Sequence, residues 1–420
     1  MVKMKRLLFL LCFIFLCSCS APYKSSFEED RLFYVKRVSF KSKETNVDDG
    51  FMNAIWVSQF DMHPIYREGG KQRDLNDYMR LVGIMTDNLV RDGFDTVFLQ
   101  VRPNGDSMFE SEIYPNSKYV AGCYGGDIEY DAVGVFLNIA KSKGISVHAW
   151  INPFRLSSES ELLSYGDGIL YDWYTEGVGN RIERASDGLL YLDPAFEDAT
   201  ELICRGAEEI LSKYDFDGLH IDDYFYPTEF EFDDEESFLK SGFVDLGDFR
   251  RSNINRTVKA LYEVADKHEK LFGVSPAGNI YSLENGWYVD IYSWLSSEGY
   301  VDYIMPQIYF GFKNAVCPFD TVLKDWANAV KNESIKLYIG LSGAKCALGS
   351  QSVADAFAGE DGRFEWRDEK DILARSYKLS LQSADGVCVF SYSSFYDSIS
   401  GKDNPLCREE KENLISLFAQ

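Results

Sequence analysis

The chain has 420 residues, of which 45% are apolar and 15% aromatic, with 32 glycines and 11 prolines. This composition is typical of an ordered globular protein with a large core, and it excludes a disordered chain. The formal net charge is −24, and no stretch is rich in lysine and arginine. We therefore expect no nucleic-acid partner and no binding to anionic membranes through a basic surface, whereas a neutral or locally steered ligand fits the charge.

The N-terminus has the layout of a secretory signal. Three basic residues precede an apolar run over 7–16, which is short for a helix that spans a bilayer, so a permanent membrane anchor is the weaker alternative. The sequence LCSC that ends at Cys19 resembles a bacterial lipobox, which implies cleavage before Cys19 and a lipid on its thiol. We predict a signal peptide over 1–18, a polar tether over 19–50, and an exported protein that is lipid-anchored to the bacterial cell envelope and meets the membrane through this lipid only.

From residue 51 onward, short apolar runs alternate with amphipathic segments such as 75–93 and 196–215, whose apolar residues recur at three- and four-residue spacing. Eight such units predict an α/β fold of the (β/α)₈ (TIM) barrel type, as a single domain over 51–420. A doubly wound sheet is the alternative, but no GxGxxG motif follows a strand. The predicted strands are 54–60, 96–103, 146–154, 218–225, 271–278, 302–310, 336–344 and 386–395.

Two connections, over 104–130 and 155–193, are long and follow the second and third strands. Loops of that length in a compact domain are usually functional or disordered.

The fourth strand runs into FDGLHIDDYFYP at 216–227. Alternate residues of a barrel strand face the helices and the interior, and side chains at the carboxyl end of the strand build the site. If Leu219 and Ile221 face the helices, His220, Asp222 and Tyr224 face inward. Asp222 then lies in the barrel mouth. Asp223 lies at the transition from strand to loop.

The same alternation predicts further polar and aromatic side chains in the mouth. One such side chain alone more often completes a hydrogen-bond network than binds substrate. A buried carboxylate has a partner or a chemical role, so Asp222 either pairs with Arg102 or serves catalysis, and His220 either orients Asp222 or contacts substrate. The residues predicted to line a sugar site are Asp61, Gln100, Arg102, Asn152, His220, Tyr224, Gln307 and Tyr309.

Eight motifs in chain order resemble the bacterial glycosyl-hydrolase-like 10 family of exported, often lipid-anchored barrel proteins. They are WVSQFD, FDTVFLQVRPNGDSMFESEIYP, HAWINPFR, YLDPAFEDA, FDGLHIDDYFYP, GVSPAGN, YIMPQIYFGF and GVCVFSYSSF, over about residues 52–394. The resemblance implies a glycoside hydrolase of bacterial cell-wall glycan, particularly peptide-free peptidoglycan strands of alternating amino sugars. It implies that Asp222 and Asp223 are the catalytic carboxylates and that Arg102, Asn152 and Gln307 line the sugar site.

A remoter likeness is to family 18 chitinases, whose fourth strand reads DGxDxDxE. Here His220 stands at the first inner Asp of that motif, Asp222 at the second and Tyr224 at the catalytic Glu. We expect Asp222 to be ionised and a second carboxyl of raised pKa to donate the proton, with Asp223 and the more distant Asp61, Asp106, Asp193 and Glu284 as candidates. The mechanism stays open between retaining, inverting and substrate-assisted.

Two other classes of function compete with a glycoside hydrolase. Tyr224 at the Glu position favours a non-catalytic glycan-binding lipoprotein on the same scaffold. The sequences DMH at 61–63 and HIDD at 220–223 prompt a metal-dependent hydrolase, but the chain has four histidines and no HxH after its first strand. The six cysteines after Cys19 follow no metal-type spacing, and their pairing stays open. We predict no metal and no cofactor. The oligomeric state stays open.

Overall fold

The computed structural model describes residues 50–176, 181–223, 225–227 and 233–418. Eight parallel strands close into a barrel in the order β1-β13-β12-β11-β10-β9-β5-β4, which confirms the predicted (β/α)₈ fold. Each strand overlaps one of the predicted apolar runs. The strands are β1 (Met52–Val57), β4 (Thr96–Arg102), β5 (Ser146–Ile151), β9 (Gly218–Ile221), β10 (Leu271–Val274), β11 (Tyr303–Ile304), β12 (Lys336–Ser342) and β13 (Gly386–Phe390).

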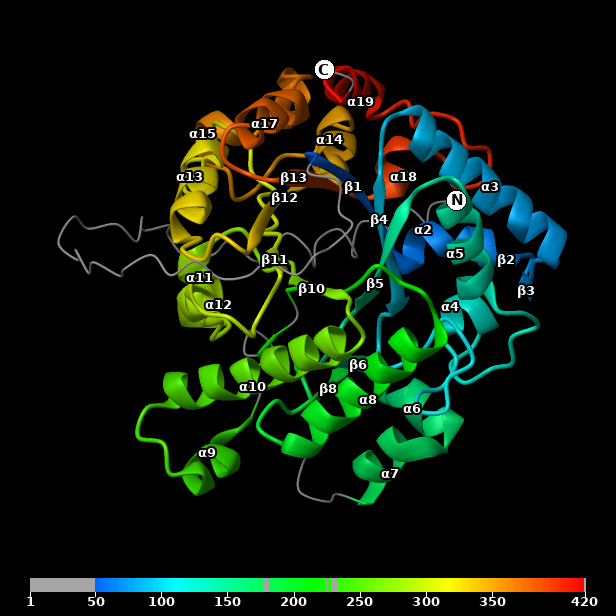
Figure 1. Cartoon of the computed structure of the whole chain (residues 1–420), viewed down its shortest axis with the longest axis vertical. Coiled ribbons are helices and arrows are strands. Elements are labelled where there is room, and N and C mark those ends of the chain that lie inside the picture. Colours follow the sequence, from blue (N-terminus) through cyan, green and yellow to red (C-terminus); the bar gives the residue numbers. More distant parts are fainter. Residues whose placement is uncertain (1–49, 177–180, 224, 228–232, 419–420) are drawn as a thin grey trace.

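Helices surround the strands, and α10 (Leu246–Lys267), the longest in the described part of the chain, lies side by side with α8 (Glu197–Lys213) (Figure 1). None of the described helices is both long and apolar enough to cross a bilayer. The remaining helices are α2 (Gln59–Tyr66), α3 (Leu75–Arg91), α4 (Lys118–Ala121), α5 (Ala132–Ser142), α6 (Glu159–Tyr165), α7 (Gly168–Glu176), α9 (Glu235–Ser241), α11 (Ile280–Gly286), α12 (Ile291–Ser296), α13 (Phe319–Ala329), α14 (Gly343–Ser350), α15 (Gly359–Gly362), α16 (Glu365–Asp368), α17 (Ile372–Ser380), α18 (Tyr392–Phe395) and α19 (Arg408–Ile415).

Helix α3 shows how the local sequence sets an element. Asp74 precedes it, and the Asp74 carboxylate accepts hydrogen bonds from the backbone N–H groups of Asn76 and Asp77, which have no acceptor within the helix. Apolar residues, including Leu81, Met85 and Leu89, then recur at helical spacing. They form the face of α3 that is buried against the barrel.

The two long connections are present as predicted, but both carry structure. The first contains α4 and a bridge between Ser107 and Asn116. The second folds into α6, α7 and an antiparallel sheet of β6 (Arg155–Ser158), β8 (Leu189–Leu192) and β7 (Ile182–Arg184). A short hairpin, β2 (Arg67–Glu68) and β3 (Lys71–Gln72), follows α2.

The barrel has two separate apolar cores, as strand alternation predicts. Helix-facing residues such as Val97, Leu99 and Leu219 pack against the surrounding helices. Inward residues form a second cluster within the barrel, made chiefly of Ala54, Trp56, Phe98, Trp150, Tyr303, Met305, Tyr338 and Cys388. Two inward glycines leave room for the large rings of this cluster. A Cβ on Gly218 would stand 2.3 Å from Nδ1 of His148, and one on Gly273 would stand 2.0 Å from the ring of Tyr303.

Strand β11 is shorter than the predicted run over 302–310. Pro306 follows it closely, and proline cannot donate to a strand ladder. Beyond the proline, Gln307 makes isolated bridges to Ala277 and Gly340, so the barrel wall continues there without a regular strand.

Candidate active site

Below the mouth, the barrel interior holds a chain of hydrogen bonds between neutral rings. The Trp56 indole donates to Nε2 of His220 at 3.4 Å, and the Tyr303 hydroxyl lies 3.1 Å from Nδ1 of His220 and 3.1 Å from Nδ1 of His148. Burial lowers the pKa of His148 to about 4 and that of His220 well below its ordinary range, so both rings are neutral. His220, predicted to contact sugar, is fully buried among these rings and lies below the mouth.

Above this layer, a second chain of hydrogen bonds leads to Asp222. The backbone N–H of Gln59 donates to Oε1 of Gln100 at 2.9 Å, and Nε2 of Gln100 donates to Oδ1 of Asn152 at 2.6 Å. Nδ2 of Asn152 then donates to Oδ2 of Asp222 at 2.6 Å. Gln100 and Asn152 are almost completely buried, so they hold the carboxylate in place, and this argues against the direct sugar contacts predicted for them.

The second carboxylate, Asp223, lies where β9 gives way to the following loop, and it is half-buried, whereas Asp222 is 3% exposed. The Gln307 amide acts on the Asp223 carboxylate as a hydrogen-bond donor and also donates to the Ser275 carbonyl at 3.1 Å. The Tyr309 ring, 6.2 Å from that of Phe390, lies near both carboxylates and is partly exposed. Gln307 and Tyr309 therefore lie beside the pair as predicted.

Burial raises the pKa of both aspartates, and Asp223 raises that of Asp222 further. Because Asp222 is the more deeply buried of the two, it holds a proton to higher pH than Asp223 does. Oδ1 of Asp222 and Oδ1 of Asp223 are buried and accept no hydrogen bond of regular geometry in the described part of the chain, although the Trp150 indole N–H lies close enough to Asp222 to lower its pKa. This order of ionisation is the reverse of our expectation that Asp222 is the ionised member.

The predicted inward orientation of Arg102 is wrong. A β-bulge between Gln100 and Arg102 shifts the register with β5, so that Arg102 pairs with the helix-facing Ile151. The guanidinium lies 4.7 Å from the Tyr114 ring and donates to the Tyr114 hydroxyl at 2.6 Å, beside α8. A Cβ on Gly206 of α8 would crowd both side chains. Arg102 therefore packs between barrel and helix and makes no ion pair with Asp222.

The cation that does lie at the mouth is Arg155, the first residue of β6. Its guanidinium lowers the pKa of both aspartates, against the larger effect of burial, and it donates to the Pro103 carbonyl at 3.1 and 3.2 Å. Strand alternation could not identify this residue because it lies beyond the end of β5. The one available signal was its place at the end of the motif HAWINPFR.

Asp61 lies beside the mouth in a structural position. Its Oδ2 accepts from the Ser58 backbone N–H and hydroxyl at 2.7 Å each, which caps α2, and its Oδ1 accepts from the Ser391 hydroxyl at 3.1 Å and the Ser393 N–H at 2.9 Å. Both oxygens are occupied and the side chain is fully buried. This placement argues against the predicted sugar contact. Asp61 instead ties the first barrel strand to the chain after the last one.

Two other buried carboxylates lie in the long connections. Oδ1 of Asp106 accepts from the Asn104 N–H at 2.8 Å, and burial raises the pKa of Asp106. Asp193 follows β8, and burial raises its pKa to about 7. Its Oδ1 accepts from the Ala195 N–H at 2.8 Å, and the charged groups near it are Glu183, Asp234 and Arg256. Neither is among the groups that set the pKa of Asp223.

Several predicted positions lie outside the described residues, namely Tyr224 and the N-terminal segment with Cys19. The six cysteines that are described, Cys123, Cys204, Cys317, Cys346, Cys388 and Cys407, are free thiols. Over the same described ranges, no group of three or more His, Cys, Asp or Glu side chains is placed to hold a metal ion.

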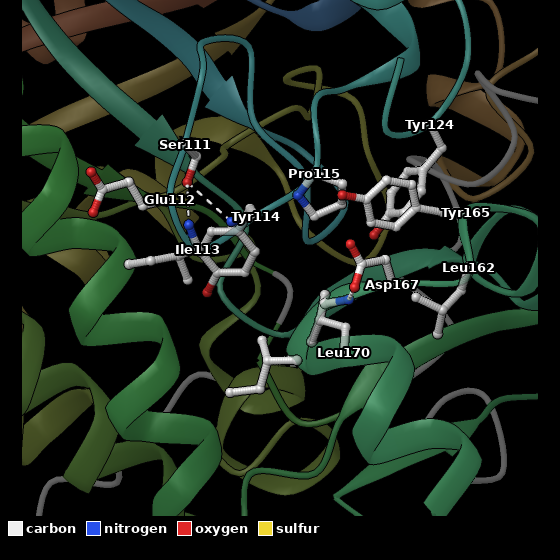
Figure 2. Close-up of a pocket in the computed structure, with 12 residues that line it drawn as sticks. Ser111, Glu112, Ile113, Tyr114, Pro115, Tyr124, Leu162, Tyr165, Asp167 and Leu170 are labelled. Carbon is white, nitrogen blue, oxygen red and sulfur yellow. Dashed lines mark hydrogen bonds between the residues drawn. The ribbon is translucent and has the colours of Figure 1, made fainter. Parts of the chain in front are cut away.

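The two long connections face each other across a cavity of about 190 Å³. Figure 2 shows Tyr114 and Pro115 of the first connection opposite Asp167 and Leu170 of the second. The Tyr124 and Tyr165 rings meet edge to face there, at 5.8 Å. Neither Asp222 nor Asp223 lines this cavity, so it is separate from the carboxylate pair.

Asp222 and Asp223 lie at the carboxyl end of β9, the end of a closed parallel barrel that carries the catalytic groups of barrel enzymes, and this placement is compatible with a glycoside hydrolase. The comparison with known sequences agrees, since a family model described as "Glycosyl hydrolase-like 10" matches residues 51–356. The chain belongs to this family.

Two curated relatives illustrate the likeness. Glycosyl hydrolase YngK of Bacillus subtilis is 30% identical over 326 residues, which cover 71% of this chain and 61% of the relative. Glycosyl hydrolase DigH of Escherichia coli K12 is 31% identical over 290 residues, which cover 61% of this chain and 64% of the relative. The chain thus spans about three fifths of the length of these relatives.

Solved structures share the fold at low sequence identity. The glycoside hydrolase domain of PgaB (BpsB) from Bordetella bronchiseptica has a TM-score of 0.55 and 14% identity, over 87% of this chain and 99% of that chain. The catalytic domain of a β-amylase from Paenibacillus polymyxa has a TM-score of 0.53 and 11% identity, over 88% of this chain and 99% of that chain. These likenesses confirm the barrel architecture.

Proposed function

We propose that the protein is a glycoside hydrolase that cleaves an amino-sugar glycan of the bacterial cell envelope, such as peptide-free peptidoglycan strands. The observation that carries the proposal is the pair Asp222 and Asp223 at the barrel mouth, two adjacent carboxyls whose pKa burial raises, with Asp222 the more deeply buried of the two. Two titratable groups with pKa values pushed apart are what acid and anion roles in glycoside hydrolysis require. The names of the two curated relatives support glycosyl hydrolysis, and the family resemblance supports the amino-sugar class.

The geometry supports Asp222 as the proton donor. Its proton passes to the glycosidic oxygen as the bond between that oxygen and the sugar carbon breaks, and Asp222 becomes a carboxylate that Asn152 stabilises by its hydrogen bond to Oδ2. Asp223, half-buried and ionised at lower pH, stabilises the positive charge that develops on the sugar ring or attacks it. Water then completes the hydrolysis. The partly exposed Tyr309 ring supplies an apolar face for a sugar.

Export and anchoring are part of the same proposal. A cell-wall glycan lies outside the cytoplasmic membrane, and the lipobox at Cys19 supplies both the export signal and the tether. We expect radiolabelled palmitate to enter the wild-type protein and not the Cys19→Ala variant. A wild-type protein that never takes up palmitate would show that the lipoprotein hypothesis is wrong.

The activity is tested by incubating the purified protein with a panel of amino-sugar polymers and neutral glucans and reading the products by mass spectrometry. We expect cleavage of an amino-sugar polymer by the wild type and none by Asp222→Asn. Cleavage of neutral glucans alone would overturn the substrate class. Tight binding of glycan without any product would favour the alternative, a glycan-binding lipoprotein.

A further inference from the structure

The chain of hydrogen-bonded amides that ends at Asp222 starts from a backbone N–H, a group that can donate a hydrogen bond but cannot accept one. Gln59 is the first residue of α2, and its backbone N–H therefore has no acceptor within the helix. That N–H donates to Oε1 of Gln100 at 2.9 Å in a buried position. A backbone N–H never accepts a hydrogen bond, and it lies at the positive end of the helix dipole.

This first donor sets the direction of every later bond in the chain. Because Oε1 of Gln100 accepts from Gln59, Nε2 of Gln100 faces Asn152 and has a hydrogen to donate. Oδ1 of Asn152 therefore accepts, and Nδ2 of Asn152 is left to donate to Oδ2 of Asp222. The carbonyl oxygen of a neutral carboxyl group is a better hydrogen-bond acceptor than its hydroxyl oxygen, so the oxygen that accepts this bond is the one that carries no proton. The proton of a neutral Asp222 therefore resides on Oδ1.

Resting on the proposed function, we propose that Gln59, through its backbone N–H, and Gln100 are positioning residues that fix the proton of Asp222 on Oδ1. They act through Asn152, which they hold in the orientation that donates to Oδ2. Oδ1 is the oxygen of Asp222 that accepts no hydrogen bond of regular geometry in the described part of the chain, so it is the oxygen left to carry the proton. The hydrogen-bond chain also keeps the Asn152 amide donating to Oδ2 of the carboxylate that remains after proton transfer.

If the anchor is removed, the two amides are free to rotate together. Oδ1 of Asn152 then faces Oδ2 of Asp222, an arrangement that is favourable only when the proton sits on Oδ2. The ionised carboxylate loses a donor, and the proton moves from Oδ1 to Oδ2. Both consequences are measurable, because the first changes the titration of Asp222 and the second changes the rate of glycosidic cleavage.

The position of Gln59 allows the anchoring N–H to be deleted alone. Proline is favoured at the first position of a helix, and the preceding residue, Ser58, has φ −83° and ψ 168°, which suits a residue before proline. Gln59→Pro therefore removes the N–H and keeps the helix start. Gln59→Ala is the matched control, because it removes the same side chain and keeps the N–H. Comparing the two variants isolates the hydrogen bond.

Two readouts are made on the full chain. In the free protein, pH-dependent infrared difference spectra follow the protonated carboxyl band that is absent in Asp222→Asn. We expect its midpoint at higher pH in Gln59→Pro than in Gln59→Ala. In the glycan assay, we expect kcat at least tenfold lower in Gln59→Pro than in Gln59→Ala, with a KM that differs by less than about threefold. The alkaline limb of the pH–rate profile should lie at higher pH in Gln59→Pro.

Equal midpoints and equal kcat in the two variants would overturn the inference. The infrared readout needs no substrate, so a wild-type protein that cleaves no glycan would refute the proposed function and still leave this inference testable. If Gln59→Pro does not fold, Gln100→Met, of nearly the same shape, releases Asn152 in its place, and the same upward shift of the midpoint is required. An unshifted midpoint in a folded Gln100→Met would refute the positioning role.

Discussion

Two layers of the same barrel interior both bury polar groups along a directed chain of hydrogen bonds, yet they end differently. The lower chain starts at the Trp56 indole and passes through His220 and Tyr303 to His148. The upper chain starts at the Gln59 N–H and ends at Asp222. The lower chain joins neutral rings, whereas the upper one ends at a carboxyl with an unpartnered buried oxygen beside a second carboxyl.

Buried polar groups that hold a barrel together therefore differ from those that do chemistry by what lies at the end of their hydrogen-bond chain. Burial acts on both layers and disfavours charge in both, so it lowers the pKa of His148 and raises that of Asp222. In the lower layer the result is a fixed neutral core. In the upper layer the result is a proton held on a buried carboxyl at the barrel mouth. The site is therefore defined by the free oxygen and the second carboxyl, and burial alone does not define it.

The largest expected effect is on the upper layer. Asp222→Asn keeps the shape of the side chain and removes the proton, so we expect kcat to fall by about 10²–10⁴-fold with the fold retained. Glycan cleavage measures kcat, and thermal unfolding measures whether the fold is retained. Asp61→Asn is the control, because it turns one of the two oxygens of a structural carboxylate into a donor and so disrupts two of the four hydrogen bonds that the carboxylate accepts. The stability of this variant should fall while its activity follows the folded fraction. Wild-type cleavage by Asp222→Asn would show that the site is misassigned.

Asp223→Asn should also lose activity, by about 10²–10³-fold, because it removes the charge opposite the developing cation. Activity on a nitrophenyl glycoside distinguishes the roles of the two aspartates. Its leaving group needs little protonation, so Asp222→Asn should recover much of its rate on this substrate and Asp223→Asn should not. The reverse pattern would assign the proton donor to Asp223.

The lower layer should set an acid limit on stability. Burial lowers the pKa of His148 from 6.5 to about 4, so the stabilisation from its neutral form is complete above pH 6.5 and is lost as the pH falls towards 4, by up to about 3 kcal/mol. The raised pKa of Asp222 acts in the opposite direction, because protonation favours the folded state. Denaturant unfolding between pH 4 and 7 should show a weaker loss in His148→Gln than in the wild type. Equal slopes would contradict the neutral-core interpretation.

The smallest effect is expected from Tyr303→Phe, which removes the hydroxyl shared by His148 and His220. Two buried ring nitrogens lose their partner, so the free energy of unfolding should fall by about 1–3 kcal/mol. Activity per folded molecule should stay within about twofold, since Tyr303 lies below the mouth. Urea unfolding and kcat measure these quantities. A loss of kcat as large as that of Asp222→Asn would mean that the two layers are coupled.

Much of this architecture could be predicted because barrel strands are apolar runs with a two-residue alternation. That pattern located all eight strands and placed His220 and Asp222 on the inner face. It failed at Arg102, because a β-bulge adds a residue without any apolar signature and reverses the alternation beyond it. It also overlooked β6, β7 and β8, whose runs of three or four residues are too short to stand out.

The site was harder to predict than the fold because its groups are set by contacts across the chain. Gln100 and Asn152 were found by alternation, yet only the three-dimensional contacts reveal that they face each other and the aspartate. Arg155 reaches the mouth from beyond a strand end, where alternation no longer applies. The order of ionisation of Asp222 and Asp223 depends on how deeply each is buried, which adjacency in sequence does not determine.

The link made by Asp61 has a consequence for how the chain folds. Its partners Ser391 and Ser393 lie more than 300 residues away and follow β13, the last strand, which pairs with both β1 and β12. A nascent chain that ends before Gly386 contains all the earlier strands of the barrel. Its sheet is still open, however, and the two exposed edges are templates for aggregation. Contacts this distant in sequence also form slowly. Closure therefore waits for nearly the whole polypeptide, and C-terminal truncations that reach β13 should accumulate as insoluble protein.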